Sequence, residues 1–216
     1  MKPKVVSFDL NGTLVTHEYV NYFWEELLPK LYAERKGLKE SEAKEIVFSL
    51  YEKVGSYDIR WYLPEYWIRR LDLGIKFKEL TSVLKKKVVL YPEALETLHY
   101  LKDKVKLLIL TNVSIEFVNV VFSRFPVFKK VFSSAYSCVS HFYLPKKDER
   151  FYKTILRLKR LKPHLLIHVG DDHIYDYKVP RRIGIQAYYI NREKCHNSTA
   201  LKDLRDFIRL IENILK

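Results

Sequence analysis

The chain has 216 residues, of which 48% are hydrophobic and 30% are charged, and its formal net charge is +13. This composition is typical of a globular protein and excludes a disordered or fibrous chain. No run of the sequence approaches the roughly 20 apolar residues that cross a bilayer, and no signal-peptide core follows the N-terminus, so we expect neither membrane insertion nor secretion.

Short apolar runs that end in polar residues and lead into a helical period predict buried parallel strands. The predicted strands cover residues 5–8, 106–110, 165–169 and 185–190, with a weaker candidate at 131–136. Predicted helices cover residues 114–124, 148–161, 173–182 and 199–215. This alternation predicts an α/β fold with a Rossmann-like doubly wound parallel sheet.

A long gap interrupts the alternation after the first strand. Apolar positions there recur near helical spacing and predict helices at 17–36, 39–54, 60–71 and 76–87. Pro92 then favours the start of a further helix, because proline is well tolerated in the first turn. We therefore predict an α/β core domain made of 1–15 and 91–216, and an all-helical domain made of 16–90.

Polar side chains follow three of the predicted strands, at the sheet edge where ligands of open α/β sheets bind. They are Asp9 and Asn11, then Thr111 and Asn112, then Asp171, Asp172 and Asp176. Carboxylates gathered at one edge repel one another unless a cation neutralises them, which favours a metal site. The alternative use of these residues is helix capping, by Thr111 or Ser114 and by one of Asp171 and Asp172.

In the order and strand context of these motifs, the chain resembles the haloacid dehalogenase superfamily of hydrolases. Asp9-Leu10-Asn11-Gly12-Thr13 lies where that family has its nucleophile loop, Thr111-Asn112 resembles its second motif, and Gly170-Asp171 to Asp176 resembles its acidic fourth motif. The helical region 16–90 resembles the cap that members carry after the first motif. The resemblance covers nearly the whole chain.

The third motif of the family is a lysine, which spacing must select here. Lys146 lies 25 residues before Asp171, the customary separation, and aligns Pro163 as in typical members. We therefore assign the role to Lys146 and keep Lys147 as the alternative. Family members usually have proline after this lysine, whereas here Pro145 precedes Lys146.

The resemblance implies attack by Asp9 on a phosphoryl group, giving an aspartyl-phosphate that water hydrolyses. It also implies Mg²⁺ held by Asp9, the Asn11 main-chain carbonyl, Asp171 and Asp176. Thr111, the Asn112 backbone N–H and Lys146 would contact the phosphoryl oxygens. The implied partner is a small phosphorylated substrate.

Asn11 departs from the family pattern, because phosphatases of the family have aspartate there to protonate the leaving oxygen and then activate water. An amide cannot exchange protons at neutral pH, and losing a positioned acid–base group costs about 10²–10⁴ in rate. We therefore expect an Mg²⁺-dependent phosphatase with weak turnover that works best on good leaving groups.

Two other functions stay open. In a 2-haloacid dehalogenase, Asp9 attacks carbon and halide leaves without a proton, so Asn11 is no defect, but the acidic fourth motif would repel the carboxylate substrate. In a catalytically impaired scaffold, the basic segment 146–162 binds an acidic partner. We expect that segment to be a solvated helix face and expect no nucleic acid, because it lacks aromatics at stacking intervals.

The sequence also indicates a compartment and a source. Two cysteines, Cys138 and Cys195, are too few for a disulfide framework, so we expect free thiols in a reducing, cytoplasmic location. Glycine and methionine are scarce, at 6 and 1 residues, and charged residues are abundant. This pattern is typical of proteins selected by heat, and we expect a thermophilic source.

Overall fold

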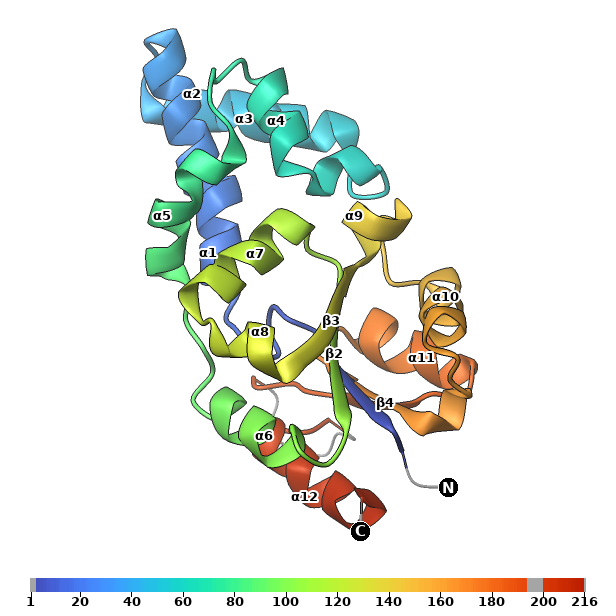
Figure 1. The fold of residues 1–216 in the computed structure, drawn as a ribbon. Coiled ribbons are helices and arrows are strands. Elements are labelled where there is room, and N and C mark those ends of the chain that lie inside the picture. Colours follow the sequence, from blue (N-terminus) through green and yellow to red (C-terminus); the bar gives the residue numbers. More distant parts are fainter. Residues whose placement is uncertain (1–2, 194–199, 216) are drawn as a thin grey trace.

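The computed structural model describes residues 3–193 and 200–215. Its centre is a five-stranded parallel sheet in the order β3-β2-β1-β4-β5 (Figure 1). The strands are β1 (Val5–Phe8), β2 (Lys106–Thr111), β3 (Phe132–Ser137), β4 (Leu166–Gly170) and β5 (Gln186–Tyr189). The predicted strands, the weaker candidate included, are confirmed to within one residue at each end. The doubly wound α/β fold is confirmed with them.

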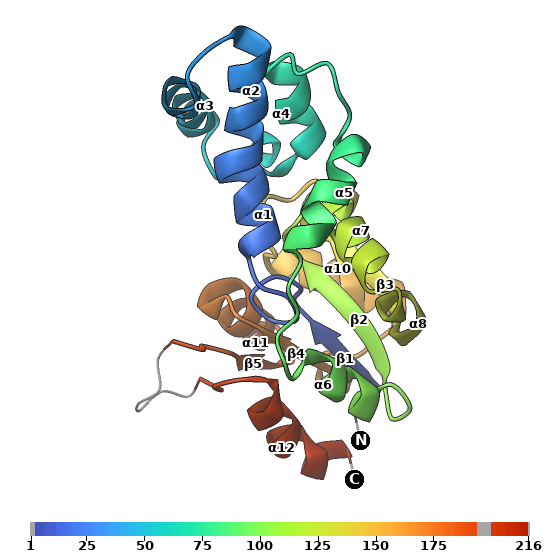
Figure 2. The same cartoon turned by 90° about the vertical axis from the view of Figure 1, so that its left-hand side faces the viewer.

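Helices cover both faces of the sheet, which is why β1 and β4 are buried along their whole length. One face packs against α6 (Ala94–Leu101), α7 (Ile115–Arg124), α8 (Val127–Val131) and α12 (Leu204–Leu215) (Figures 1 and 2). The other packs against α9 (Cys138–Phe142), α10 (Glu149–Lys159) and α11 (Val179–Arg182). The short helices α8 and α9 were not predicted from the sequence.

The chain between β1 and α6 is helical, as the sequence predicts. Its elements are α1 (Glu18–Tyr22), a π-helical turn (Phe23–Leu27), α2 (Leu28–Lys36), α3 (Glu40–Val54), a 3₁₀ turn (Ile59–Tyr62), α4 (Pro64–Arg70) and α5 (Phe77–Lys87). Figure 2 shows α2, α3 and α4 standing away from the sheet, with α1 and α5 leading to them. The predicted helix at 60–71 is divided by Pro64, which begins α4.

The two connections between the sheet and these helices run side by side. Val15 pairs with Leu90, the Thr16 N–H donates to the Val89 carbonyl at 2.9 Å, and the Tyr91 N–H donates to the Leu14 carbonyl at 3.1 Å. These contacts lie at the predicted borders, 15/16 and 90/91. We propose on this basis that 16–90 forms a cap domain on a core made of 1–15 and 91–216.

The C-terminal part differs from the prediction in its helix ends. The predicted helix 173–182 is a π-helical turn (His173–Lys178) followed by α11, and α12 begins at Leu204 rather than at residue 199. Residue 199 and Cys195 lie outside the described residues. None of the described helices combines the length and apolarity needed to span a bilayer.

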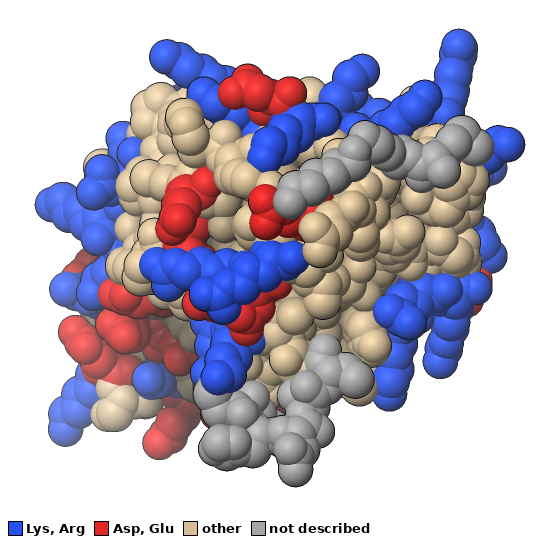
Figure 3. Space-filling view, turned by 90° about the horizontal axis from the view of Figure 1, so that it is seen from below, with Lys and Arg blue, Asp and Glu red and all other residues tan. Residues whose placement is uncertain are grey.

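Basic side chains are accompanied by acidic ones on the face seen from below the sheet and in the basic segment 146–162. On the face that carries α6 and α12, lysines and arginines lie around the edge and also across the middle, with acidic residues among them (Figure 3). In the basic segment 146–162, Arg150 and Lys153 pair with Asp148 and Glu149, at 2.6 and 2.8 Å. These ion pairs reduce the charge that α10 presents to an acidic partner.

Candidate active site

The ends of three neighbouring strands bring the predicted residues together. Asp9 follows β1, Thr111 ends β2 and Asp171 follows β4, and β1 lies between the other two strands. A cavity of about 240 Å³ opens at this edge of the sheet. Its lining includes Asp9, Asn11, Thr111, Asn112, Asp171 and Asp176, all of them predicted from the sequence, together with Lys147.

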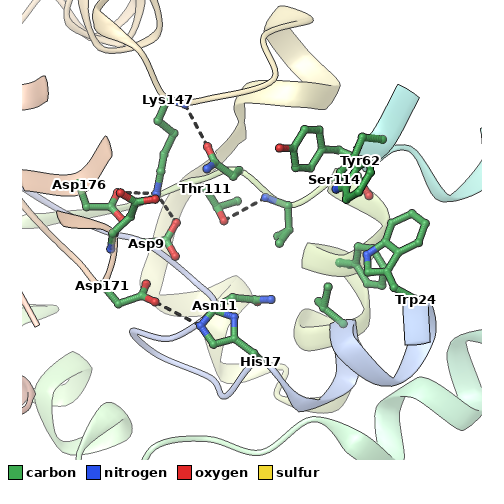
Figure 4. Close-up of a pocket in the computed structure, with 16 residues that line it drawn as sticks. Asp9, Asn11, His17, Trp24, Tyr62, Thr111, Ser114, Lys147, Asp171 and Asp176 are labelled. Carbon is green, nitrogen blue, oxygen red and sulfur yellow. Dashed lines mark hydrogen bonds and ion pairs between the residues drawn. The ribbon is translucent and has the colours of Figure 1, made fainter. Parts of the chain in front are cut away.

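Three carboxylates form a cluster at one side of the cavity. Asp9, Asp171 and Asp176 each offer an oxygen atom, and these atoms lie within 4.8 Å of one another (Figure 4). Asp9 and Asp176 are buried, and Asp171 is partly exposed. Oxygen atoms so arranged are the ligands that Mg²⁺ prefers, so the residues present fit a divalent ion.

A buried lysine contacts two of these carboxylates, and it is Lys147. Its ammonium touches the carboxylates of Asp9 and Asp176 and donates to the Leu110 carbonyl at 3.3 Å. Only 2% of the Lys147 side chain is exposed. A lysine this deeply buried requires charged partners, because an unpaired buried charge is very costly.

The prediction that Lys146 occupies this position is wrong. The Lys147 N–H donates to the Asn112 side-chain carbonyl at 3.0 Å, and this contact turns the Lys147 side chain inward. Lys146 points elsewhere, with its ammonium 5.0 Å from the Tyr62 ring centre and 5.8 Å from that of Tyr175. Spacing along the sequence could not separate two adjacent lysines, because it does not record which one faces the cavity.

Burial and mutual repulsion shape the charges of the cluster. Burial, together with the nearby carboxylates of Asp176 and Asp171, raises the pKa of Asp9 to about 8 in spite of Lys147. Burial acts in the same direction on Asp176, but Lys147 and His168 outweigh it and lower the pKa of Asp176 to about 2. The same two carboxylates raise the pKa of Lys147 although burial alone would lower it. Until a divalent ion binds, therefore, the protonated form of Asp9 is favoured at neutral pH.

Buried polar groups contact Asp176 and the turn that carries it. The His168 Nε2 atom lies 2.8 Å from the Asp176 carboxylate, and Nδ1 lies 2.8 Å from the Ser7 hydroxyl. Burial lowers the pKa of His168, so the ring is neutral at physiological pH. The Tyr152 hydroxyl donates to the Tyr175 carbonyl at 2.6 Å, fixing the turn that carries Asp176. These contacts orient the carboxylate toward Asp9.

Asp171 and Asp172 have different tasks. The Thr13 hydroxyl donates to the Asp171 carboxylate at 3.3 Å, and His17 Nε2 lies 3.2 Å from it. The hydrogen bond to Asp171 is the main cause of a raised pKa at His17. Asp172 instead accepts from two backbone N–H groups of the turn that follows it. Of the two, Asp172 is therefore the capping residue.

Asn11 lies in the cavity wall with a fixed side chain. The hydroxyl of Tyr19, a fully buried residue of α1, donates to the Asn11 side-chain carbonyl at 2.8 Å. The Asn11 amide nitrogen is thereby left to face the cavity (Figure 4). The residue at this position is thus a hydrogen-bond donor toward a ligand and cannot act as an acid or a base.

The second motif, Thr111 and Asn112, lines the cavity and also positions neighbouring residues. The Thr111 hydroxyl is buried and accepts from the Val113 N–H at 3.4 Å. The Asn112 side chain accepts from the Lys147 N–H and from the Cys138 thiol, at 3.0 and 3.1 Å. Asn112 therefore positions the lysine through its side chain.

Gly12 gives a prediction about the cluster. Its φ is +77°, and a Cβ atom there would overlap the Asp171 carboxylate and lie 2.6 Å from His17 Nε2. Replacing Gly12 by Ala should therefore displace Asp171 and weaken Mg²⁺ binding at least tenfold, as titration calorimetry can measure. Gly37→Ala is the matched control, because φ there is +67° with nothing within 4 Å. Both variants should lose about 1–2 kcal/mol of stability from backbone strain, and equal Mg²⁺ affinities would contradict the prediction.

Several residues of the site were not predicted from the sequence. His17 stands at the start of α1 and His168 inside β4, far apart in the sequence. His168 could have been found from the sequence, because it is a titratable residue inside an otherwise apolar strand, and such a residue usually has a buried polar partner. His17 and Tyr19 left no signal, because their roles depend on how α1 leaves the first motif.

The fold and the site together define a hydrolase of the doubly wound α/β class, with an aspartate after the first strand and an acidic cluster beside it. The family model of haloacid dehalogenase-like hydrolases matches residues 3–184. The chain therefore belongs to this family, and it is an enzyme.

Known proteins agree with this assignment. The chain is 26% identical to the GMP/IMP nucleotidase YrfG of Escherichia coli K12 over 169 residues, which are 77% of this chain and 73% of that protein. A HAD phosphatase from Thermococcus onnurineus has the same fold, with a TM-score of 0.79, 22% identity and coverage of 96% and 97% of the two chains. A 2-haloacid dehalogenase from Pseudomonas syringae also shares it, with a TM-score of 0.67, 18% identity and coverage of 98% and 99%.

Proposed function

We propose that the protein is an Mg²⁺-dependent phosphatase of small phosphorylated molecules, with Asp9 as the nucleophile. The observation that carries this proposal is the cluster of Asp9, Asp171 and Asp176 with the ammonium of Lys147 between Asp9 and Asp176. Three carboxylates exceed one lysine in charge, and a divalent cation would balance them. A phosphate dianion could then approach Asp9.

Each residue of the site has a part in this reaction. Asp9 would attack phosphorus and form the aspartyl-phosphate, which water then hydrolyses. Lys147, in contact with Asp9, would hold a phosphoryl oxygen, and the Thr111 hydroxyl and the Asn112 N–H would hold others. Asp9, Asp171, Asp176 and the Asn11 main-chain carbonyl would hold Mg²⁺, which supplies charge neutralisation on the phosphoryl group when bound.

The related proteins support a phosphate ester as substrate. The relative in Escherichia coli is a GMP/IMP nucleotidase, and it aligns over 77% of this chain. A dehalogenase has less support, since the 2-haloacid dehalogenase from Pseudomonas syringae shares the fold at only 18% identity. An acidic cluster also repels a 2-haloacid, which is itself a carboxylate.

A phosphate-release assay tests the proposal. With Mg²⁺, the protein should release phosphate from acetyl phosphate and from aryl phosphates, and a chelator should abolish this release. Chloride release from 2-chloropropionate without a divalent ion, in a protein that releases no phosphate, would show a dehalogenase instead. Absence of both activities, with salt-sensitive binding of an acidic partner, would indicate a scaffold.

Asn11 gives the second prediction. Asn11→Asp places a carboxyl group beside the Tyr19 hydroxyl and restores an acid–base group to the site. We expect kcat on sugar phosphates, whose leaving groups are poor, to rise about 10–10²-fold, and kcat on acetyl phosphate to change far less. Steady-state kinetics on both substrates measures the difference. An equal effect on the two substrates would mean that another group supplies the proton.

The raised pKa of Asp9 gives a third prediction, about pH. Because Asp9 holds a proton below its pKa of about 8, Mg²⁺ must displace that proton to bind. The Mg²⁺ dissociation constant should therefore fall about tenfold per pH unit from pH 6 toward 8 and level off above it. Calorimetry across this range measures the slope. Asp9→Asn is the control and should remove the slope; the same slope in both proteins would assign it to another group.

A further inference from the structure

The side of the cavity opposite the carboxylates is aromatic. Figure 4 shows Trp24, Tyr62 and Ser114 across the cavity from Asp9 and Lys147. Trp24 and Tyr62 come from the π-helical and 3₁₀ turns of the helical segment, and Trp61 beside Tyr62 also lines the cavity. An aromatic surface does not bind a phosphate group, so we expect it to contact another part of the substrate.

A second cavity, of about 330 Å³, adjoins the first. The two share Trp24 and Trp61, and the second is also lined by Glu25, Phe48, Tyr51 and Glu52. The Tyr51 ring contacts those of Trp24 and Trp61, with centroids 5.9 and 6.1 Å apart, and its hydroxyl donates to the Trp24 carbonyl at 3.1 Å. The two indoles are thus held in place by the protein itself and offer a preformed surface for a flat ring.

The aromatic side of the cavity also carries a hydroxyl for which the described part of the chain offers no partner. Ser114 is fully buried, and its Oγ atom makes no hydrogen bond within the described part of the chain. It precedes α7 as its N-cap residue, yet its side chain caps no backbone N–H. A buried hydroxyl left unpaired is costly, so a polar group of a ligand in the cavity would satisfy it.

We propose that the substrate is a nucleoside 5′-monophosphate, with its phosphate at Asp9 and its base on Trp24 and Trp61. The inference rests on the proposed function and extends it to a substrate class. One side of the cavity offers charged groups for a phosphate, and the opposite side offers the Ser114 hydroxyl for a sugar hydroxyl and indole faces for a base. Hydrolysis breaks the phosphorus–oxygen ester bond; water gives hydroxide to phosphorus and a proton to the 5′ oxygen.

The second cavity also selects among bases. Its charged groups are the carboxylates of Glu25 and Glu52, which accept hydrogen bonds and repel a phosphate. These two exposed carboxylates disfavour a phosphate at this end, which favours the orientation with the phosphate at Asp9. Guanine presents N–H donors on the ring edge that would face the two carboxylates, whereas adenine presents a ring acceptor there. The arrangement favours guanine over adenine.

Kinetics on three phosphate esters tests the proposal. With Mg²⁺, kcat/KM should be at least about tenfold higher for GMP than for ribose 5-phosphate, which lacks the base, and higher for GMP than for AMP. Trp61→Leu should lower the ratio of kcat/KM for GMP to kcat/KM for ribose 5-phosphate about tenfold. Tyr57→Leu is the matched control, because Tyr57 is 87% exposed in the same helical segment and lines neither cavity. Glu52→Gln should lower the ratio of kcat/KM for GMP to kcat/KM for AMP.

A binding experiment separates this inference from the proposed function. The Asp9→Asn protein with Mg²⁺ should bind GMP at least about tenfold more tightly than ribose 5-phosphate in titration calorimetry. If the wild type hydrolyses acetyl phosphate but the two ligands bind equally, the nucleotide inference is overturned and the phosphatase stands. If GMP binds tightly but no ester is hydrolysed, the phosphatase is overturned and the nucleotide site stands.

Discussion

Replacing Asp9 by asparagine should reduce phosphate release by at least about 10⁴-fold, because the amide cannot attack phosphorus. Asparagine has the same shape and removes one of the three clustered carboxylates, so the fold should persist. The measurement is phosphate release under saturating Mg²⁺, together with circular dichroism of the variant. Loss of activity with an intact fold is the expected result.

Asp172→Asn is the matched control for this substitution. Asp172 lines the same cavity, but its carboxylate caps the following turn and is not part of the cluster. Asparagine is as good a capping residue as aspartate, so activity should stay within about threefold. A loss in Asp172→Asn as large as that in Asp9→Asn would contradict the assignment of the nucleophile.

Lys147→Met should lower activity by about 10²–10³-fold and also destabilise the protein. The substitution removes the buried ammonium that neutralises the carboxylates of Asp9 and Asp176, at a cost of about 3–5 kcal/mol. The loss of stability should grow from pH 5 to 8, because carboxylates that are no longer neutralised can still take up protons at low pH. Denaturant unfolding at the two pH values, with and without Mg²⁺, measures this.

Lys146→Met is the control that separates the two adjacent lysines. Lys146 lies over the rings of Tyr62 and Tyr175, so its loss should cost about 1 kcal/mol or less in stability and little activity. If Lys146→Met were the inactive variant and Lys147→Met the active one, the geometry described here would be refuted.

The sequence predicts the sheet well because parallel strands buried on both faces leave short apolar runs. The residue after each run is then expected at the carboxyl edge, and this is how Asp9, Thr111 and Asp171 could be assigned to one place. The position of a strand end does not predict where the side chains of loop residues point. Lys147 lies in the loop between α9 and α10, and its direction is set by a hydrogen bond to Asn112.

Other parts of the site depend on packing that a local pattern does not record. The Tyr19 hydroxyl reaches Asn11 because α1 follows the first motif closely, and Trp24 and Trp61 both pack on Tyr51 although they lie 37 positions apart in the sequence. Their spacing is equally compatible with an ordinary helical core. Only the three-dimensional arrangement distinguishes a wall of a cavity from the interior of a helical bundle.

The central place of β1 in the sheet has a consequence for synthesis of the protein. Of the five strands of the sheet, β1 is synthesised first, yet its two neighbours, β2 and β4, begin only at residues 106 and 166. The contact between Lys147 and Asp9 spans 138 residues, and that between Ser7 and His168 spans 161. The nascent chain must therefore keep an apolar strand unpaired until most of its length has emerged, which is a period open to chaperones and to aggregation.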